Sequence, residues 1–380
     1  MTPIEPNVLP DGIRSRFVSD VNGLNMHVLE AGSPDQPLLL LLHGFPELAY
    51  SWRKVILPLA EAGYRVVAPD QRGYGRTADG ATEYDVDLEP YGMLNLTRDA
   101  LALVRALGFE TVAAVVGHDF GASVAAYCAL IRPDVFRKVA IMSAPFSGPP
   151  AFPYNTDGDS AAVPGSAGRG DIDAELASLS RPRKHYHSYY STRPANADMQ
   201  HCAQGMADFL RGYFHGKSAD WPGNDPHRLE AWAADNLAEM PTYYIMDRDT
   251  TMAETAATFM PTAKEIAACE WLPDGELAFY AAEYSRTGFQ GGLNWYRGRL
   301  DAALTAGLRL FSGRTIDVPS IFISGENDWG VYQSPGAVEA MQERVCPRMS
   351  GVHLLPGAGH WVQQEQPAAV VAHVTQLLAS

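Results

Sequence analysis

The chain has 380 residues, which is enough for one large α/β core with a second unit inserted into it. Apolar residues make up 46% and charged residues 19%, as in a globular protein with a sizeable core. Because 44 acidic residues face only 29 basic ones, the net charge of −15 repels phosphate backbones and anionic membranes, and this argues against a nucleic-acid partner.

The N-terminal stretch MTPIEPNVLPDG has no basic segment followed by an apolar one, so it does not predict a secretion signal. The longest purely aliphatic run, 38–42, is too short to cross a bilayer and predicts a buried parallel strand. The four cysteines are scattered without a CxxC pair, which argues against a disulfide framework or a zinc site. We therefore expect a cytoplasmic protein that does not insert into membranes; its oligomeric state is left open.

From residue 24 onward, strand-like and helix-like patterns alternate. Short apolar runs typical of strands occupy 24–32, 37–44, 64–70, 111–117 and 138–145. Helical patterns lie between several of them, at 51–63, 97–108 and 122–131. Repeated strand–helix units predict an α/β fold with a mainly parallel sheet covered by helices on both faces.

The alternation stops near residue 147. Residues 148–170 contain nine glycines and prolines and predict an irregular loop. The following stretch is rich in aromatic residues and helix formers but has no convincing strands. Strand-like segments return at 318–328 and 351–360, before a last helix. The sequence thus predicts two units, an α/β core of 1–146 and 306–380 and an inserted helical cap, or lid, of 147–305.

The segment GHDFG, 117–121, joins a strand to a helix and is typical of the sharp turn that exposes a nucleophile in the α/β-hydrolase fold, with Asp119 at its centre. In this fold an acid and then a histidine follow, each after a strand, and Asp328 and His360 occupy those places. An aspartate after a strand is often only a helix N-cap, but the joint order favours a catalytic triad. Glu326 is the competing acid.

Two backbone N–H groups are expected to form an oxyanion hole. One belongs to Phe120, the residue after the nucleophile, and the other to Phe45 in the HGFP turn. We expect the side chains beside these groups to line the substrate pocket, namely Phe45, Pro46, Phe120 and Trp361.

The segments HGFPE, DQRGYG, GHDFGA, GFQGGLNWYR, GEND and GAGHW together resemble the epoxide hydrolases of the α/β-hydrolase superfamily. Of these, GFQGGLNWYR separates that family from the haloalkane dehalogenases, which share HGFP, DQRGYG and the GxDxG turn. The resemblance implies that Tyr296 is one of two lid tyrosines that hydrogen-bond the epoxide oxygen. It places the second at Tyr186, with Tyr189 and Tyr190 as neighbours on one helical face. The family commonly has tryptophan where this chain has Phe120.

An aspartate nucleophile suits this chemistry. A carboxylate is ionised at neutral pH and can attack a strained epoxide carbon, forming a glycol ester on Asp119, while tyrosine hydroxyls donate to the leaving oxygen. Water activated by His360 and Asp328 then hydrolyses the ester to a vicinal diol. The expected partners are a neutral, hydrophobic small-molecule epoxide and water, with no metal or cofactor.

Two other functions remain as alternatives. A haloalkane dehalogenase would use the same ester mechanism but needs indole or amide N–H groups for the halide, whereas LNWYR and the cap tyrosines supply phenols. A dehalogenase of the fluoroacetate type calls for arginine directly after the nucleophile, where Phe120 stands. A non-catalytic small-molecule binder on the same fold is the last alternative, although such a protein is expected to lose a triad member and none is missing.

Overall fold

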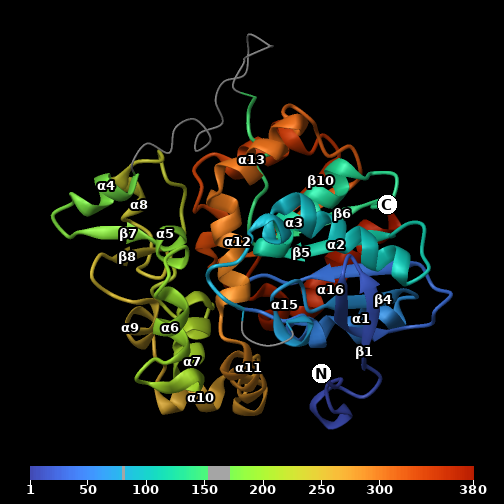
Figure 1. Cartoon of the computed structure of the whole chain (residues 1–380), viewed down its shortest axis with the longest axis horizontal. Coiled ribbons are helices and arrows are strands. Elements are labelled where there is room, and N and C mark those ends of the chain that lie inside the picture. Colours follow the sequence, from blue (N-terminus) through green and yellow to red (C-terminus); the bar gives the residue numbers. More distant parts are fainter. Residues whose placement is uncertain (79–81, 153–171) are drawn as a thin grey trace.

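The computed structural model describes residues 1–78, 82–152 and 172–380. The loop predicted over 148–170 lies, from residue 153 onward, outside the described residues. Figure 1 shows a sheet with its helices on one side of the molecule and a group of helices on the other.

The sheet has eight strands in the order β1-β2-β4-β3-β5-β6-β9-β10. β2 pairs antiparallel with β1 and with β4, and the remaining pairs are parallel, so the predicted mainly parallel sheet is confirmed. The edge strand β1 was not predicted, because its mostly part-exposed side chains give no apolar run. The strands are β1 (Arg14–Val21), β2 (Leu24–Ala31), β3 (Leu38–Leu42), β4 (Arg65–Pro69), β5 (Ala114–His118), β6 (Val139–Met142), β9 (Ser320–Gly325) and β10 (Met349–Leu355).

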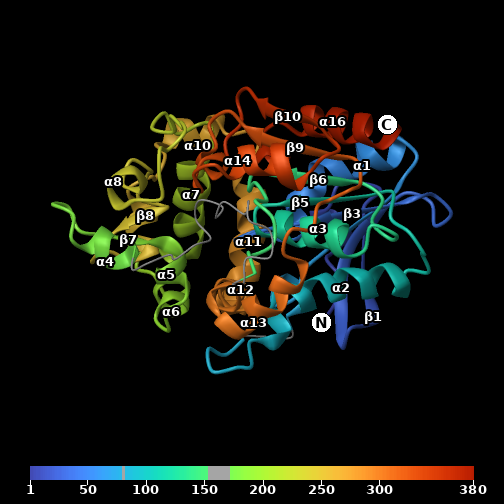
Figure 2. The same ribbon diagram turned by 90° about the horizontal axis from the view of Figure 1, so that it is seen from above.

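Helices cover both faces of the sheet, as predicted. α1 (Arg53–Glu61) and α16 (Pro367–Ala379) pack together on one face, and α2 (Met93–Ala106) and α3 (Phe120–Ile131) on the other (Figure 2). Every residue of β3, β4 and β5 is therefore buried, which is why these strands read as continuous apolar runs. Two shorter helices, α14 (Ala337–Ala340) and α15 (Val362–Glu365), follow β9 and β10.

Residues 172–308, between β6 and β9, hold the helical group in Figure 1. This region also contains a short antiparallel pair, β7 (Arg183–His185) and β8 (Ile245–Asp247). This pair was not predicted, because strands of three residues are too short to give a recognisable sequence pattern. The predicted boundary between residues 305 and 306 falls inside α13, which packs on both α12 and α2. The helices are α4 (Ile172–Ala177), α5 (Tyr186–Tyr190), α6 (Ala195–Gln200), α7 (Gly205–Lys217), α8 (Ala234–Leu237), α9 (Met252–Ala257), α10 (Ala263–Ala268), α11 (Asp274–Thr287), α12 (Gln290–Leu300) and α13 (Ala302–Leu308).

Short helical turns complete the described chain. Six are 3₁₀ helices and the last is a π-helix: η1 (Pro6–Val8), η2 (Ala49–Trp52), η3 (Gly75–Thr77), η4 (Glu89–Tyr91), η5 (Arg309–Phe311), η6 (Trp329–Val331) and η7 (Met341–Val345). Within the described residues, no helix has the length and apolar character needed to span a bilayer. All four cysteines are free thiols.

Candidate active site

Asp119 stands at the turn between β5 and α3, with φ 53° and ψ −119°. This conformation is strained for a residue with a side chain, so the surrounding chain must enforce it. The two flanking glycines allow the strand and the helix to approach closely. A Cβ at Gly117 would lie 2.1 Å from the carbonyl oxygen of Gly121, and one at Gly121 would lie 2.3 Å from that of Leu42. The GxDxG pattern is therefore a packing requirement of the turn.

The three predicted triad residues meet at the carboxyl ends of the parallel strands. His360 Nδ1 lies 3.1 Å from Asp328 Oδ1, and His360 Nε2 lies 3.4 Å from Asp119 Oδ2. Asp328 also accepts hydrogen bonds from Ser324 Oγ at 2.8 Å and from the Gly330 N–H at 2.7 Å, which hold its carboxylate in place. Glu326, the competing acid, is exposed to solvent.

The charges in this group support one another. Burial acts to raise the pKa of Asp119, but the hydrogen bond and charge of His360, together with the charge of Lys217, hold it below the usual range. Burial acts to lower the pKa of His360, but Asp328 and Asp119 raise it to about 9. At neutral pH the imidazole is therefore protonated between two carboxylates. Esterification of Asp119 would remove one of these two charges and so favour the neutral imidazole that can act as a base.

The backbone N–H groups predicted as an oxyanion hole flank the nucleophile. The Phe45 N–H donates to Asp119 Oδ1 at 2.9 Å, which leaves Oδ2 on the side of His360. Phe120 is the first residue of α3, so its N–H has no acceptor within the helix. Gly44 lets the HGFP turn come this close, since a Cβ there would lie 2.3 Å from Asp119 Oδ1.

Behind the triad lies a buried acid–histidine pair. The Glu47 carboxylate is hydrogen-bonded to His118 Nδ1, and His118 Nε2 lies 2.7 Å from the carbonyl oxygen of His360. Gln363 Nε2 donates to Glu47 Oε1 at 2.7 Å. This network positions the backbone of His360. Glu47 lies in the HGFPE segment, whose sequence does not predict this role; its fully buried position marks it in the structure.

A cavity opens beside the nucleophile, and two predicted tyrosines line it. The rings of Tyr186 and Tyr296 lie 6.0 Å apart, from α5 and α12. Burial raises the pKa of the Tyr296 hydroxyl well above its usual range, and the charge of Asp119 adds to this, so it remains a proton donor. The lining residues are Asp119, Phe120, Ser123, Ala144, Pro145, His185, Tyr186, His187, Trp232, Tyr296, Arg299, Gln333 and Ser334.

The neighbouring tyrosines of α5 point elsewhere. The Tyr189 hydroxyl donates to Asp198 at 2.9 Å, and that of Tyr190 bonds to Tyr213 at 3.1 Å, and neither residue lines the cavity. The Tyr186 hydroxyl donates to Gln333 at 3.1 Å, at the cavity wall.

Of the four predicted pocket residues, Phe120 lines this cavity and the other three do not. Phe45 packs its ring edge-on against Tyr296, with 5.5 Å between the ring centres. Trp361 is fully buried, and its indole N–H donates to the carbonyl oxygen of Phe214 at 2.8 Å. Pro46 is also buried.

A buried lysine that sequence analysis did not single out lies near the triad. Lys217 ends α7 and is 3% exposed, and its ammonium nitrogen lies 4.4 to 5.7 Å from the ring centres of four tyrosines: Tyr186, Tyr213, Tyr243 and Tyr244. Among the described residues, no oxygen accepts a hydrogen bond from this group. Burial lowers its pKa to about 8, opposed by the charges of Asp119, Asp328 and Glu47.

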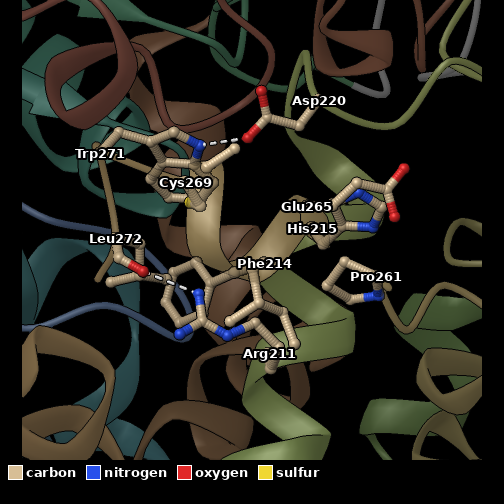
Figure 3. Close-up of a pocket in the computed structure, with 11 residues that line it drawn as sticks. Arg211, Phe214, His215, Asp220, Pro261, Glu265, Cys269, Trp271 and Leu272 are labelled. Carbon is tan, nitrogen blue, oxygen red and sulfur yellow. Dashed lines mark hydrogen bonds between the residues drawn. The ribbon is translucent and has the colours of Figure 1, made fainter. Parts of the chain in front are cut away.

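A second cavity, of about 150 Å³, lies in the cap beside α7 and α10 (Figure 3). It shares no lining residue with the cavity around Asp119. Two pairs of its lining residues bond one another, since Arg211 donates to the Leu272 carbonyl and the Trp271 indole donates to Asp220, both at 2.7 Å. Within the described residues, no cluster of His, Cys, Asp and Glu is placed to hold a metal ion. We therefore assign the candidate chemistry to the cavity that contains Asp119.

Comparisons with known proteins find relatives that match nearly the whole chain. A family model described as the alpha/beta hydrolase fold matches residues 37–367. Epoxide hydrolase A of Mycobacterium tuberculosis is 35% identical and covers 97% of this chain and 98% of its own length. Among solved structures, an epoxide hydrolase from an endophytic Streptomyces is 31% identical with a TM-score of 0.76, covering 97% of this chain and 96% of its own. The structure of epoxide hydrolase A from Mycobacterium thermoresistibile is 32% identical with a TM-score of 0.73, and the match covers 97% of this chain and 98% of that one.

Proposed function

Since the chain belongs to the epoxide hydrolases of the α/β-hydrolase fold, we propose that it converts an epoxide to a vicinal diol through an ester on Asp119. One observation carries this proposal: a buried carboxylate with a histidine–aspartate pair on one side faces the same cavity as two tyrosines. The relatives named above are epoxide hydrolases, so a haloalkane dehalogenase is not favoured.

In the first step, Asp119 Oδ2 attacks an epoxide carbon and the carbon–oxygen bond on the far side breaks. Oδ1 stays hydrogen-bonded to the Phe45 N–H and becomes the carbonyl oxygen of the ester. Tyr296 and Tyr186 donate to the departing oxygen, and one of them supplies the proton that makes it a hydroxyl. We assign the second lid role to Tyr186 because it lines the cavity, whereas Tyr189 and Tyr190 do not.

In the second step, water attacks the ester carbonyl. With Asp119 esterified, His360 faces one carboxylate instead of two, so its pKa falls and the imidazolium releases its proton to solvent. The neutral imidazole can then accept a proton from the water. Asp328 orients the imidazole, and the Phe45 and Phe120 N–H groups stabilise the oxyanion. The bond between the Asp119 carbonyl carbon and the glycol oxygen then breaks, the imidazolium gives its proton to that oxygen, and the diol leaves. The carboxyl group of Asp119 loses the other proton of the water, which reprotonates the tyrosine through solvent and restores the carboxylate. Residues of this chain supply every group in the two steps, and neither step uses a metal or cofactor.

Intact-protein mass spectrometry of a His360→Gln variant tests the proposal. Mixed with styrene oxide, the variant is expected to gain the mass of the whole epoxide, mapped to Asp119, because the ester forms but is not hydrolysed. A bromoalkane serves as the second arm, and a gain of the alkyl group without bromine would indicate a dehalogenase instead. A double variant that also carries Asp119→Asn is the control and should gain no mass. Absence of any adduct from a panel of aryl and alkyl epoxides would support a non-catalytic binder.

We also propose that the protein is cytoplasmic. Its four free thiols fit this location, because thiols stay reduced in the cytoplasm.

A further inference from the structure

Resting on the proposed function, we propose that the preferred substrate is an epoxide that carries a carboxylate, and that Arg299 binds this group at the mouth of the cavity. Arg299 lines the same cavity as Asp119 and Tyr296, from the last turn of α12, one helical turn beyond Tyr296. It is exposed to solvent, so a substrate group that is still partly hydrated can reach it.

The guanidinium is available for a ligand. Within the described part of the chain, its nitrogens form no ion pair or hydrogen bond. The guanidinium carbon lies 5.9 Å from the ring centre of Phe120. Phe120 directly follows the nucleophile and lines the same cavity, so this contact places the cation beside the residue next to Asp119. Ser123, one turn further along α3, lines the same wall.

The charges of the lining select the ligand. Asp119 is the one carboxylate among the described lining residues, and its pKa is held low by the imidazolium beside it. Arg299 is the one arginine or lysine in the same set. A carboxylate seated between the mouth and the nucleophile would therefore meet a planar fork of N–H donors that matches its two oxygens. An apolar substituent at the same place would cover the guanidinium without giving it an acceptor, which costs binding free energy.

Most of the aromatic residues between 209 and 244 in the cap do not line this cavity. Trp232 lines it. The others do not, and two of them pack against Trp361 of the core: the residues outside the lining are Phe209, Tyr213, Phe214, Trp221, Tyr243 and Tyr244, of which Tyr213 and Phe214 contact Trp361. Besides aromatic rings such as those of Phe120 and Trp232, the walls present hydroxyl and amide groups, from Ser123, Gln333 and Ser334. Such groups can hydrogen-bond a polar substituent or its water.

The test compares 4-(oxiran-2-yl)benzoate with its neutral isostere, the carboxamide. We expect the wild type to prefer the benzoate in kcat/KM, and Arg299→Gln to reduce the ratio of the two values about 3- to 5-fold, the upper range for an ion pair that solvent partly screens. Arg344→Gln, which removes an exposed arginine outside the cavity, should leave the ratio unchanged. Because each variant is measured on both substrates, a general loss of activity or of folded protein cancels from the ratio of the two kcat/KM values. Competitive inhibition of styrene oxide hydrolysis by benzoate, compared with inhibition by benzamide, measures binding of the carboxylate without turnover.

The outcomes separate this inference from the proposed function. Hydrolysis of styrene oxide with no preference for the benzoate, or a preference that survives Arg299→Gln, overturns the substrate class and leaves the epoxide hydrolase in place. Hydrolysis of none of these epoxides, with no adduct on His360→Gln, overturns both. A benzoate preference that is lost in Arg299→Gln but kept in Arg344→Gln supports the inference.

Discussion

Replacing Lys217 by methionine should stabilise the protein at neutral pH. The side chain is buried without a hydrogen-bond acceptor among the described residues, and burial lowers its pKa from the usual 10.5 to about 8. At about 1.4 kcal/mol per pH unit, holding this ammonium protonated in the fold costs about 3 kcal/mol. Contacts with four tyrosine rings offset part of this cost, by about 1 to 2 kcal/mol. Methionine is unbranched and fills similar space, so we expect a net gain of about 1 to 2 kcal/mol.

The pH dependence identifies the cause. Between pH 8 and 10.5 the unfolded chain keeps the lysine proton and the folded chain has lost it, so the stability of the wild type rises with pH over this window. Lys217→Met lacks this titration. Its advantage over the wild type should therefore be greatest below pH 8 and decline by about 3 kcal/mol as the pH approaches 10.5. Urea unfolding at several pH values measures this, with the exposed Lys264→Met as a matched control that should show no such trend.

The same substitution should impair catalysis. The charge of Lys217 lowers the pKa of His360, and its loss lets that pKa rise, so less neutral imidazole is present to activate water. Hydrolysis of the ester at pH 7 should slow and recover toward higher pH. A Lys217→Met protein that is less stable than the wild type at pH 7, or whose gain does not change with pH, would refute this reasoning.

Three further predictions concern the chemistry and the turn. Asp328→Asn should slow ester hydrolysis by about 10² to 10⁴-fold and let the ester accumulate in single-turnover mass spectra, whereas Glu326→Gln should do neither; the reverse result would move the acid to Glu326. Tyr296→Phe should slow formation of the ester about 100-fold in rapid-quench experiments, because one donor to the leaving oxygen is lost, and an unchanged rate would remove it from that role. Gly121→Ala should destabilise the fold by at least about 2 kcal/mol in urea, since its Cβ would lie 2.3 Å from the Leu42 carbonyl oxygen; a variant of wild-type stability would show that the turn can relax.

Much of the fold could be predicted because its signals are local. Apolar runs as long as a strand, such as 38–42, and the glycines around Asp119 reflect constraints between neighbouring residues, so they can be read from the chain itself. β1 and the pair β7–β8 could not be predicted, because the former is half exposed and the latter is too short for a pattern. The order of the predicted triad follows from the strands that precede each residue, and the parallel sheet brings their carboxyl ends together.

The sequence by itself determined the fold class, the family and the residues that stand at the carboxyl ends of the strands. Only the tertiary structure decided which side chains share a space. It shows that Tyr186 lines the cavity and that Tyr189 and Tyr190 do not. Sequence spacing cannot distinguish the three, because they lie on one helical face. The structure also sets Arg299 over Phe120 and seats Lys217 among tyrosines of other segments. Such contacts join side chains far apart along the chain, and their energies depend on burial and distance, which the order of residues does not specify.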